Sequence, residues 1–269
     1  MNDMPYQEQG PIRYFTFSSL DSYPLVHAVF TRHGGVSVQP WAALNLGGTV
    51  GDDPHRVMEN RRRAFSALSL DLQSVYDVWQ VHSAEVVYTD KPRPVNAPHL
   101  QADAILTDRA GVSLFMRFAD CVPILLYDPN RNAAGLVHAG WKGTVDRVAA
   151  NAVEAMHIRL GSLPEDILAA IGPSIGPHHY EVGQEVITQV QQAFKQDAAG
   201  LLQKCDRGRV DRMLFDLWNA NRLVLQQAGV RQIEISGICT ACHLEDWYSH
   251  RGEKGKTGRF GVLLGLRET

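Results

Sequence analysis

The strongest constraint on the fold is a dense series of short apolar runs between residues 103 and 138. Four runs of strand length follow one another with only turns between them, near 103–107, 112–118, 122–127 and 133–138. Such a series predicts neighbouring β-strands. Residues 143–159 then carry apolar side chains at helical spacing. Together these patterns predict an α/β fold, with helices on both faces of a central sheet.

The flanking sequence extends this pattern on both sides. We expect further strands near 12–17, 26–30, 75–81, 85–89, 167–172, 232–238 and 260–266. We expect further helices over about 51–70, 184–196 and 212–228. The first of these begins at Gly51-Asp52-Asp53-Pro54, which has the acidic cap and early proline of a helix start. Because no repeat or low-complexity segment interrupts the chain, residues 1–269 are predicted to form one domain.

Bulk properties exclude several classes of function. The formal net charge is −3, so the chain has no excess of positive charge for binding nucleic acid. No apolar stretch is long enough to span a membrane, and the first residues do not resemble a signal peptide. Four cysteines in 269 residues do not suggest a disulfide framework. We therefore expect a soluble cytoplasmic protein with reduced thiols, acting on a small molecule.

Three motifs carry candidate metal ligands at the edges of apolar runs: Gln80-Val81-His82, Ala119-Asp120-Cys121-Val122-Pro123 and His138-Ala139-Gly140-Trp141-Lys142-Gly143. Two imidazoles and a thiolate would hold zinc and leave a fourth position open, as in catalytic zinc sites. The same residues also suit a thiol nucleophile with a histidine base. The residue types alone leave both interpretations open.

The order of these and other motifs resembles a known family, the laccase-domain proteins, which are also called multicopper polyphenol oxidases, YfiH-type proteins or peptidoglycan editing factors. The resemblance covers roughly residues 25–264. The matching segments are 33–37, 44–47, 50–54, 60–61, 80–82, 102–104, 119–125, 138–143, 171–177, 180–183, 239–240 and 257–259.

The resemblance implies a three-layer α/β/α sandwich with a central mixed sheet, related to bacterial cysteine hydrolases. It makes His82, Cys121 and His138 the metal-binding and catalytic centre, with zinc as the expected ion and copper as the alternative. The activities implied are phosphorolysis of adenosine and methylthioadenosine, adenosine deamination, polyphenol oxidation, and editing of peptidoglycan precursors that carry L-Ser in place of L-Ala.

These implications reduce to competing hypotheses. The first is a zinc-dependent purine nucleoside enzyme acting as phosphorylase and deaminase. The second is a cysteine-type amidase acting on a muropeptide precursor, with Cys121 as nucleophile, His138 as base, and Asp120 or His82 orienting the pair. A copper oxidase is the least supported of the enzymatic hypotheses, because no His-x-His pair is present. The hypothesis of a non-enzymatic binding module would not explain why the three motifs are present.

A phosphorylase also needs cations and polar groups that hold phosphate. Basic residues near glycine-containing loops include Arg32 and Arg251. The residues that we predict to bind substrate or phosphate are Asn45, Arg61, Lys142, His178, His179 and Arg259. Two of these, His178 and His179, stand where many relatives have a cysteine pair. This difference argues against the copper–thiolate chemistry that the cysteine pair of those relatives would imply. It also supplies two extra imidazoles near the expected pocket.

Two further motifs carry little weight. Cys239-Thr240-Ala241-Cys242-His243 fits the pattern for haem attachment, which would require export. The same cysteines could form half of a zinc site, but the sequence holds no second Cys-x-x-Cys to complete it. We therefore predict a reduced cysteine pair at a strand end. Gly255-Lys256-Thr257 imitates a phosphate loop, but His250 stands where that loop requires glycine.

Overall fold

The computed structural model describes residues 6–205 and 211–268, whose strands form two six-stranded sheets and a three-stranded sheet. Sheet I has the spatial order β1 (Tyr6–Gln9), β2 (Ile12–Phe15), β3 (Leu25–Phe30), β15 (Phe260–Leu266), β7 (Ser113–Phe118) and β4 (Val75–Tyr76). Sheet II has the order β14 (Gln232–Ile235), β10 (Leu168–Ile171), β8 (Val122–Asp128), β9 (Ala133–Ala139), β6 (Ala104–Thr107) and β5 (Val86–Tyr88). The small sheet has the order β11 (Glu181–Gly183), β13 (Arg212–Phe215) and β12 (Leu202–Lys204).

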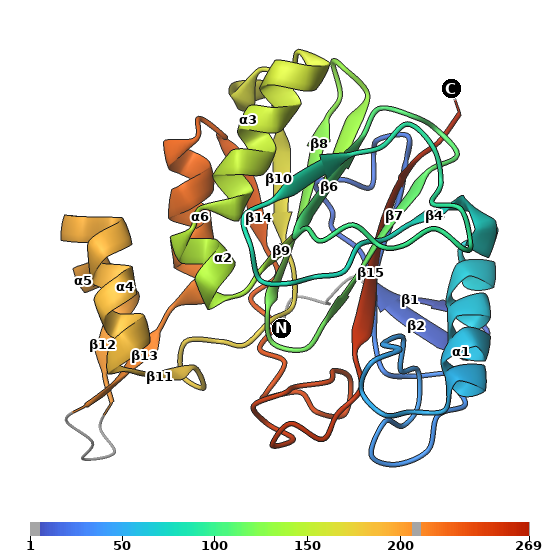
Figure 1. The fold of residues 1–269 in the computed structure, drawn as a ribbon, viewed down its shortest axis with the longest axis horizontal. Coiled ribbons are helices and arrows are strands. Elements are labelled where there is room, and N and C mark those ends of the chain that lie inside the picture. The colour runs from blue at the N-terminus through green and yellow to red at the C-terminus, as the bar shows by residue number, and fades with distance from the viewer. Residues whose placement is uncertain (1–5, 206–210, 269) are drawn as a thin grey trace.

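Helices lie on the outer faces of the two large sheets (Figure 1). The α-helices in the described ranges are α1 (Pro54–Ala67), α2 (Trp141–Val145), α3 (Val148–Leu160), α4 (Gln184–Phe194), α5 (Ala198–Leu201) and α6 (Leu217–Gln227). Short 3₁₀ turns are η1 (Leu72–Ser74), η2 (Pro164–Asp166) and η3 (Lys195–Asp197). Helices α2, α3 and α6 pack on sheet II, whereas α1 packs on sheet I.

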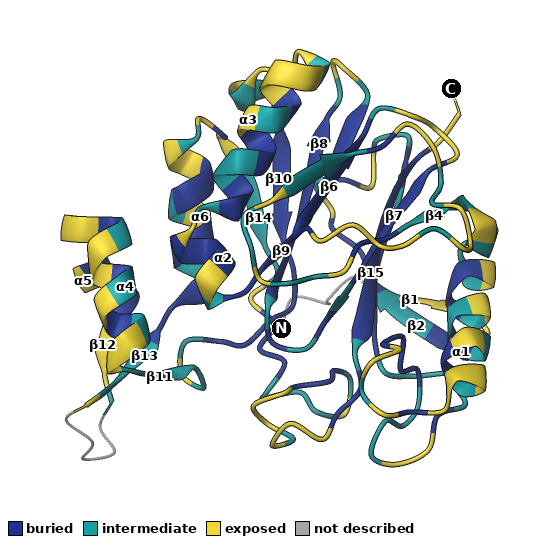
Figure 2. Cartoon of the chain, in the orientation of Figure 1, coloured by how far each residue is buried: buried dark blue, intermediate teal, exposed yellow. Residues whose placement is uncertain are grey.

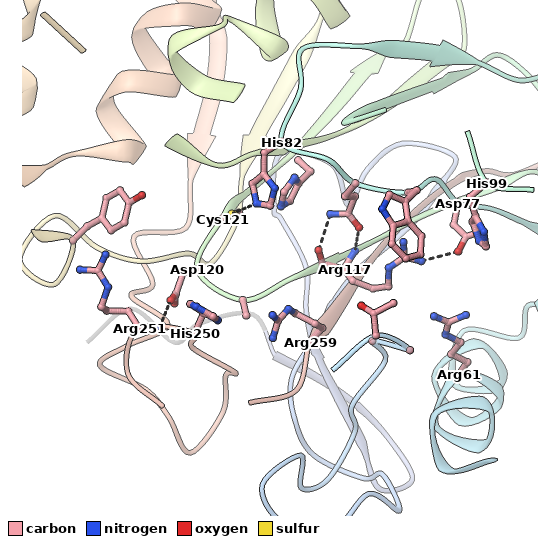
Figure 3. Close-up of a pocket in the computed structure, with 18 residues that line it drawn as sticks. Arg61, Asp77, His82, His99, Arg117, Asp120, Cys121, His250, Arg251 and Arg259 are labelled. Carbon is pink, nitrogen blue, oxygen red and sulfur yellow. Dashed lines mark hydrogen bonds and ion pairs between the residues drawn. The ribbon is translucent and has the colours of Figure 1, made fainter. Parts of the chain in front are cut away.

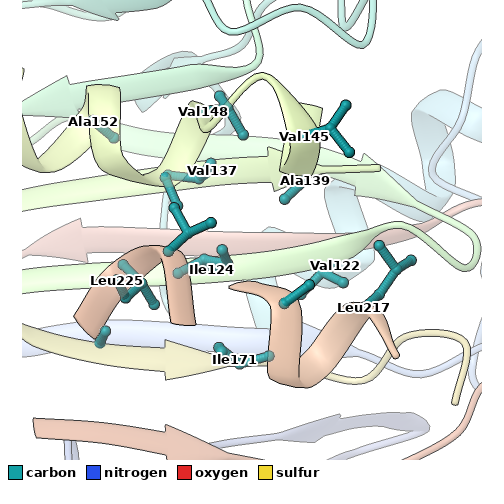
Figure 4. Packing of buried hydrophobic residues seen from close by; sticks show 14 of the residues in the cluster. Val122, Ile124, Val137, Ala139, Val145, Val148, Ala152, Ile171, Leu217 and Leu225 are labelled. Carbon is teal, nitrogen blue, oxygen red and sulfur yellow. The ribbon is translucent and has the colours of Figure 1, made fainter. Parts of the chain in front are cut away.

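Strand β8 shows why sheet II is buried on both faces. Because side chains alternate along a strand, Val122 and Ile124 face one way and Leu125 and Tyr127 face the other. The first pair packs with α2, α3 and α6, including Leu225, as Figure 4 shows. The second pair packs against sheet I. Burying an aliphatic side chain such as Val122, Ile124 or Leu125 contributes about 1.5–3 kcal/mol, so both faces of β8 help to hold the layers together.

The same alternation in β15 adds a fourth layer. Val262 and Leu264 face sheet II, whereas Leu263 faces away from it. On that outer face, Phe115 of β7 meets Phe65 of α1, with ring centroids 5.5 Å apart in an edge-to-face arrangement. The layer order is therefore helices, sheet II, sheet I and helix α1 (Figure 1).

The predicted mixed α/β fold is confirmed, but the prediction of three layers around one central sheet is wrong. The expected central strands belong to two stacked sheets, because β7 and β15 lie in sheet I while β8 and β9 lie in sheet II. A strand buried on both faces is apolar throughout, whether helices or a second sheet cover it. Figure 2 shows β8, β9 and β10 buried along their whole length.

The connection from β7 to β8 crosses from one sheet to the other through only residues 119–121. Strands β8 and β9 then pair antiparallel, with Pro123 opposite His138 and Val122 opposite Ala139. This register places His138 beside Cys121, the last residue of the crossing. The sheet topology therefore brings two of the three motifs together.

Most element positions agree with the sequence, and the differences have local causes. Helix α1 begins as predicted, with the Asp53 side chain accepting a hydrogen bond from the N–H of His55. The single helix expected over 143–159 is instead α2 and α3, separated at Arg147 by left-handed backbone with φ +63°. The helix expected over 212–228 begins only after Asp216, which caps α6, so 212–215 form β13. The strand expected over 75–81 is limited to Val75–Tyr76.

Helices α4 and α5 and the small sheet stand together at one side of the molecule (Figure 1). Helix α4 contacts both α2 and β11. Within the described ranges, the helices are all too short or too polar to cross a bilayer.

Candidate active site

Three potential metal ligands converge where β8 and β9 meet the loop after β4, and we call them the three-residue cluster: His82, Cys121 and His138. Each offers one ligand atom, and these atoms all lie within 4.8 Å of one another. The sulfur of Cys121 lies 3.8 Å from Nε2 of His82. His138 is buried, Cys121 is half-buried and His82 is exposed, so the cluster faces solvent on one side.

One carboxylate positions both imidazoles of the three-residue cluster. Nδ1 of His138 donates to Oδ1 of Asp103 at 2.8 Å. The other carboxylate oxygen accepts from the N–H groups of Ser83 at 2.6 Å and Val81 at 3.2 Å, which flank His82. A carboxylate on one ring nitrogen fixes the tautomer and leaves the second nitrogen free to bind a metal or accept a proton. Asp103 itself is fully buried.

The electrostatics of the cluster favour a thiolate beside an imidazolium. Burial raises the pKa of Cys121, but the charges and hydrogen bonds of His138 and His82 lower it by more, to about 6. Burial lowers the pKa of His138, but Cys121 and Asp103 raise it by more, to about 9. A deprotonated sulfur is the form that binds zinc and also the form that attacks carbon. The donor set and its spacing fit a zinc ion, with the solvent side as the open position.

The backbone around the cluster is constrained. His82 has φ +58° and Asp120 has φ +84°, both in the left-handed region that non-glycine residues seldom adopt. A side chain at Gly140 would place its Cβ 3.0 Å from the Cys121 sulfur and 3.0 Å from Cδ2 of His82. Strained backbone of this kind concentrates at functional sites, where the surrounding structure holds it in place.

The three-residue cluster lines a cavity of about 650 Å³ (Figure 3). The cavity extends from Cys121 and His82 to Arg61 and His99, with Arg259 between them in this view. Its cationic or titratable basic side chains are Arg61, His82, His99, Arg117, His138, His250, Arg251 and Arg259. Tyr180 and the half-exposed Trp79 add aromatic surface. A pocket of this size and composition suits a small anionic ligand with a flat ring.

Arg61 and Arg259 of this cavity are partly buried and form no direct ion pair within the described residues. Arg61 donates to the carbonyl of Leu46, and Arg259 donates to carbonyls in its own loop, but no carboxylate of the described residues forms an ion pair with either. Burial and the charge of Arg117 lower the pKa of Arg61 to about 10. Burial also lowers the pKa of Arg259. Asp77 attracts Arg61, and Cys121 and Asp120 attract Arg259, without a direct ion pair. Partly buried guanidinium groups that no carboxylate contacts directly favour binding of an anion.

Arg117 is held differently. It donates to Oδ2 of Asp77 at 2.6 Å and to the carbonyl of Val78 at 2.7 Å. Arg93 and His99 also lie within ion-pair distance of the same carboxylate. This network fixes the wall of the cavity at the end away from Cys121 (Figure 3).

Four of the predicted binding residues lie outside the cavity lining. Asn45 is buried, and its amide holds Gly47, Asp52 and the N–H of Arg259, so it supports the loop that carries Arg259. Lys142 lies 3.7 Å from Asp146 on the surface of α2. The remaining two are in a second cluster, which we call the four-residue cluster: His178, His179, Cys239 and Cys242.

Several side chains of the site were not identified from the sequence. Asp103 lies in a matching segment, but nothing in the sequence pairs it with His138, 35 residues away. Arg117 had a visible signal, because it is a charged residue inside the apolar run 112–118. His99 and His250 come from loops whose positions depend on the whole fold. Arg32, one of the predicted basic candidates, instead binds loop carbonyls and Glu253.

The chain is similar to known proteins along most of its length. The family model described as "Multi-copper polyphenol oxidoreductase laccase" matches residues 26–267. A protein of Deinococcus radiodurans named purine nucleoside phosphorylase is 42% identical over 240 residues, covering 89% of this chain and 88% of the relative. Purine nucleoside phosphorylase YlmD of Bacillus subtilis is 37% identical over 246 residues, covering 88% and 87%.

A solved structure shares the whole architecture. The crystal structure of YlmD from Geobacillus stearothermophilus superimposes with a TM-score of 0.90 at 34% identity, covering 98% of this chain and 100% of that one. The family predicted from the order of motifs is thereby confirmed. The chain belongs to the multi-copper polyphenol oxidoreductase laccase family, the laccase-domain proteins.

Proposed function

We propose that this protein is a purine nucleoside phosphorylase whose active site is the cavity beside the three-residue cluster. Relatives at 37–42% identity that carry this name support the activity. The observation that carries the proposal is the pair Arg61 and Arg259, two partly buried guanidinium groups without ion-pair partners that line the same cavity as Cys121. Inorganic phosphate would supply the direct ion-pair partner that both arginines lack.

In the proposed reaction, an oxygen of phosphate forms a bond to C1′ of the ribose. The bond from C1′ to the purine nitrogen breaks, and its electron pair leaves with the base, which takes up a proton. The products are the free purine and ribose 1-phosphate. Arg259 and Arg61 would hold the phosphate in place for attack, and Trp79 and Tyr180 offer aromatic faces to the purine.

We further propose zinc at the three-residue cluster, with copper as the alternative ion. Bound there, the ion would act as a Lewis acid that offsets negative charge during the reaction. Asp103 holds the His138 imidazole in the orientation that such a role requires. We extend the proposal to adenosine deamination in the same cavity, in which water adds to C6 and ammonia leaves.

Product analysis with and without phosphate tests this function. With adenosine, inosine or methylthioadenosine, we expect base release to require phosphate and to yield ribose 1-phosphate; release of free ribose instead would contradict phosphorolysis. Arg259→Gln should raise KM for phosphate by about tenfold to a hundredfold, since it removes a charge-assisted hydrogen bond. The matched control is Arg131→Gln, an exposed arginine that donates to Gly161 outside the cavity.

A cysteine-type amidase is the second candidate, favoured by the lowered pKa of Cys121 beside His138. It predicts that a muropeptide with L-Ser in place of L-Ala protects Cys121 from iodoacetamide. It also predicts that turnover of that muropeptide survives complete removal of zinc. The phosphorylase predicts protection by adenosine with phosphate, and loss of turnover on zinc removal.

A further inference from the structure

Two loops that are distant in sequence bring four metal-ligand side chains together outside the cavity. His178 and His179 follow β10, and the two cysteines lie in the loop after β14. All four ligand atoms of this four-residue cluster lie within 4.8 Å of one another. None of the four side chains is in the cavity lining. The sequence lacked a second Cys-x-x-Cys, but the fold supplies a histidine pair in its place.

The spacing of these atoms matches that of a tetrahedral zinc site. Zinc bonds of about 2.3 Å to sulfur and about 2.0–2.1 Å to nitrogen, at a tetrahedral angle, separate nitrogen from sulfur by about 3.5 Å. Nδ1 of His179 lies 3.6 Å from the sulfur of Cys239 and 3.5 Å from that of Cys242. Nε2 of His178 lies 3.0 Å from the Cys242 sulfur, so this exposed ring must move out by about 0.5 Å.

The backbone around the four-residue cluster holds one of its sulfurs in place. The N–H of Gly176 donates to the sulfur of Cys239 at 3.1 Å. The N–H of Cys242 donates to the carbonyl of Cys239 at 3.1 Å, which closes the turn between the cysteines. A Cβ on Gly176 would lie 2.8 Å from Cε1 of His178 and 3.2 Å from the Cys239 sulfur. Backbone donors to ligands orient metal sites, and only glycine leaves room for this one.

We propose that the four-residue cluster is a second zinc site, with a structural role. Four protein ligands fill the tetrahedral shell, so no position stays open for substrate. Two thiolates and two imidazoles are ligands that zinc prefers. The site joins loops that shape the active cavity, because the His178–His179 loop leads directly to Tyr180, which lines it.

The cysteine loop reaches the same cavity through Asp120. Thr240, next to Cys239, donates its N–H to the carbonyl of Ser174 at 3.0 Å. Its hydroxyl donates to Oδ1 of Asp120 at 2.7 Å. Asp120 also accepts from Ser249 and from the N–H of Arg251. A metal that ties the two loops together therefore stabilises the segment that precedes Cys121.

Metal content of the full-length protein tests the proposal. After saturation with zinc and removal of the excess, we expect about two zinc ions per wild-type chain and about one in the double variant Cys239→Ser/Cys242→Ser. His82→Ala should also reduce the content by one, from the other cluster. Cys205→Ser, which alters a cysteine outside both clusters, should keep the wild-type content.

Cobalt substitution supplies a readout that does not depend on activity. In the Cys121→Ser background, Co²⁺ should give an intense sulfur-to-metal band and the visible absorption of a tetrahedral S₂N₂ site. That absorption should disappear in Cys121→Ser/Cys239→Ser/Cys242→Ser. Zinc should raise the melting temperature of the Cys121→Ser protein, but not that of the triple variant.

Three results would overturn the proposal: equal zinc content in the wild type and the double variant, no tetrahedral cobalt spectrum in the Cys121→Ser background, or a disulfide between Cys239 and Cys242 in thiol counts of the purified protein. These results are independent of phosphorolysis. If the protein fails to cleave nucleosides, the metal content of the four-residue cluster still decides this proposal.

Discussion

The three-residue and four-residue clusters use the same kinds of side chain in different settings. In the three-residue cluster, strand β9 and the crossing into β8 supply two ligands, a buried carboxylate orients the imidazoles, and one side opens into a cavity. In the four-residue cluster, two loops supply a full ligand set away from the cavity. The contrast teaches that ligand number and surroundings, rather than residue type, separate a candidate catalytic centre from a structural one.

Each cluster packs against a glycine, and this allows a matched comparison. Gly140→Val should displace the Cys121 sulfur and the His82 ring, which lie 3.0 Å from a Cβ at this position. We expect a loss of kcat/KM of about 100-fold, since displacements of about 1 Å have effects of this size. Steady-state nucleoside cleavage measures it. The control is Gly200→Val, where a Cβ meets nothing within 4 Å; equal activity of both variants would contradict the assignment of the active site.

Asp103→Asn tests whether orientation of the ligands matters as much as their presence. The amide keeps the shape of the side chain but removes the charge that holds His138 and the loop of His82. We expect a loss of about 10–100-fold in zinc affinity or turnover. Zinc titration of the variant should show weakening at one site and unchanged affinity at the other. Weakening at both sites would show that the clusters are not independent.

Gly176→Val is the counterpart of Gly140→Val in the four-residue cluster. Its Cβ would displace His178 and Cys239, so we expect zinc to be lost there and the free energy of unfolding to fall by about 1–3 kcal/mol. Denaturant unfolding measures this loss. Turnover of the remaining folded protein should fall by less than in Gly140→Val, because the four-residue cluster reaches the cavity only through Tyr180 and Asp120. A 100-fold loss of kcat with unchanged stability would assign this cluster to catalysis instead.

The smallest expected effect is on stability in acid. It depends on Asp77, which belongs to neither cluster. Burial raises the pKa of Asp77, but Arg117, Arg93 and His99 lower it by more, to below its ordinary value of 3.8. Its ionised form therefore stabilises the native state above that value, and the contribution is lost as the pH falls through the lower native pKa.

Unfolding of metal-free protein at several pH values checks this prediction. Asp77→Asn should be less stable than wild type near neutral pH, and the difference should shrink as the pH falls below about 4. A difference that stays constant with pH would mean that the charge of Asp77 does not contribute. Metal-loaded protein should lose additional stability in acid from both clusters, because their ligands must be deprotonated to bind.

The sequence predicted those parts of the molecule that local patterns determine. Strands β8 and β15 and the start of α1 follow from buried runs and from the Asp53 cap. The stacking of two sheets did not follow, because a run such as Val122–Asp128 is equally apolar under helices or under another sheet. The three ligand motifs were found because each stands at the edge of such a run.

Contacts between distant loops could not be predicted in this way. His178 and Cys242 are 64 residues apart, and only the parallel pairing of β10 with β14 brings their loops together. The sequence interpretation of a reduced cysteine pair therefore missed its histidine neighbours. Arg259 was found through a matching segment, whereas Arg117 was missed although its charge interrupts a buried strand.

The position of β15 has a consequence for how the protein becomes active during synthesis. Residues 260–266 insert between β3 and β7, and so complete sheet I from its middle. Strand β7 leads directly into the crossing that carries Cys121. A nascent chain can already contain all three ligands and still lack the strand that pairs with β7. Pairing between strands that are distant in sequence requires both strands to be present. Activity should therefore arise late, only after residues 260–266 have left the ribosome.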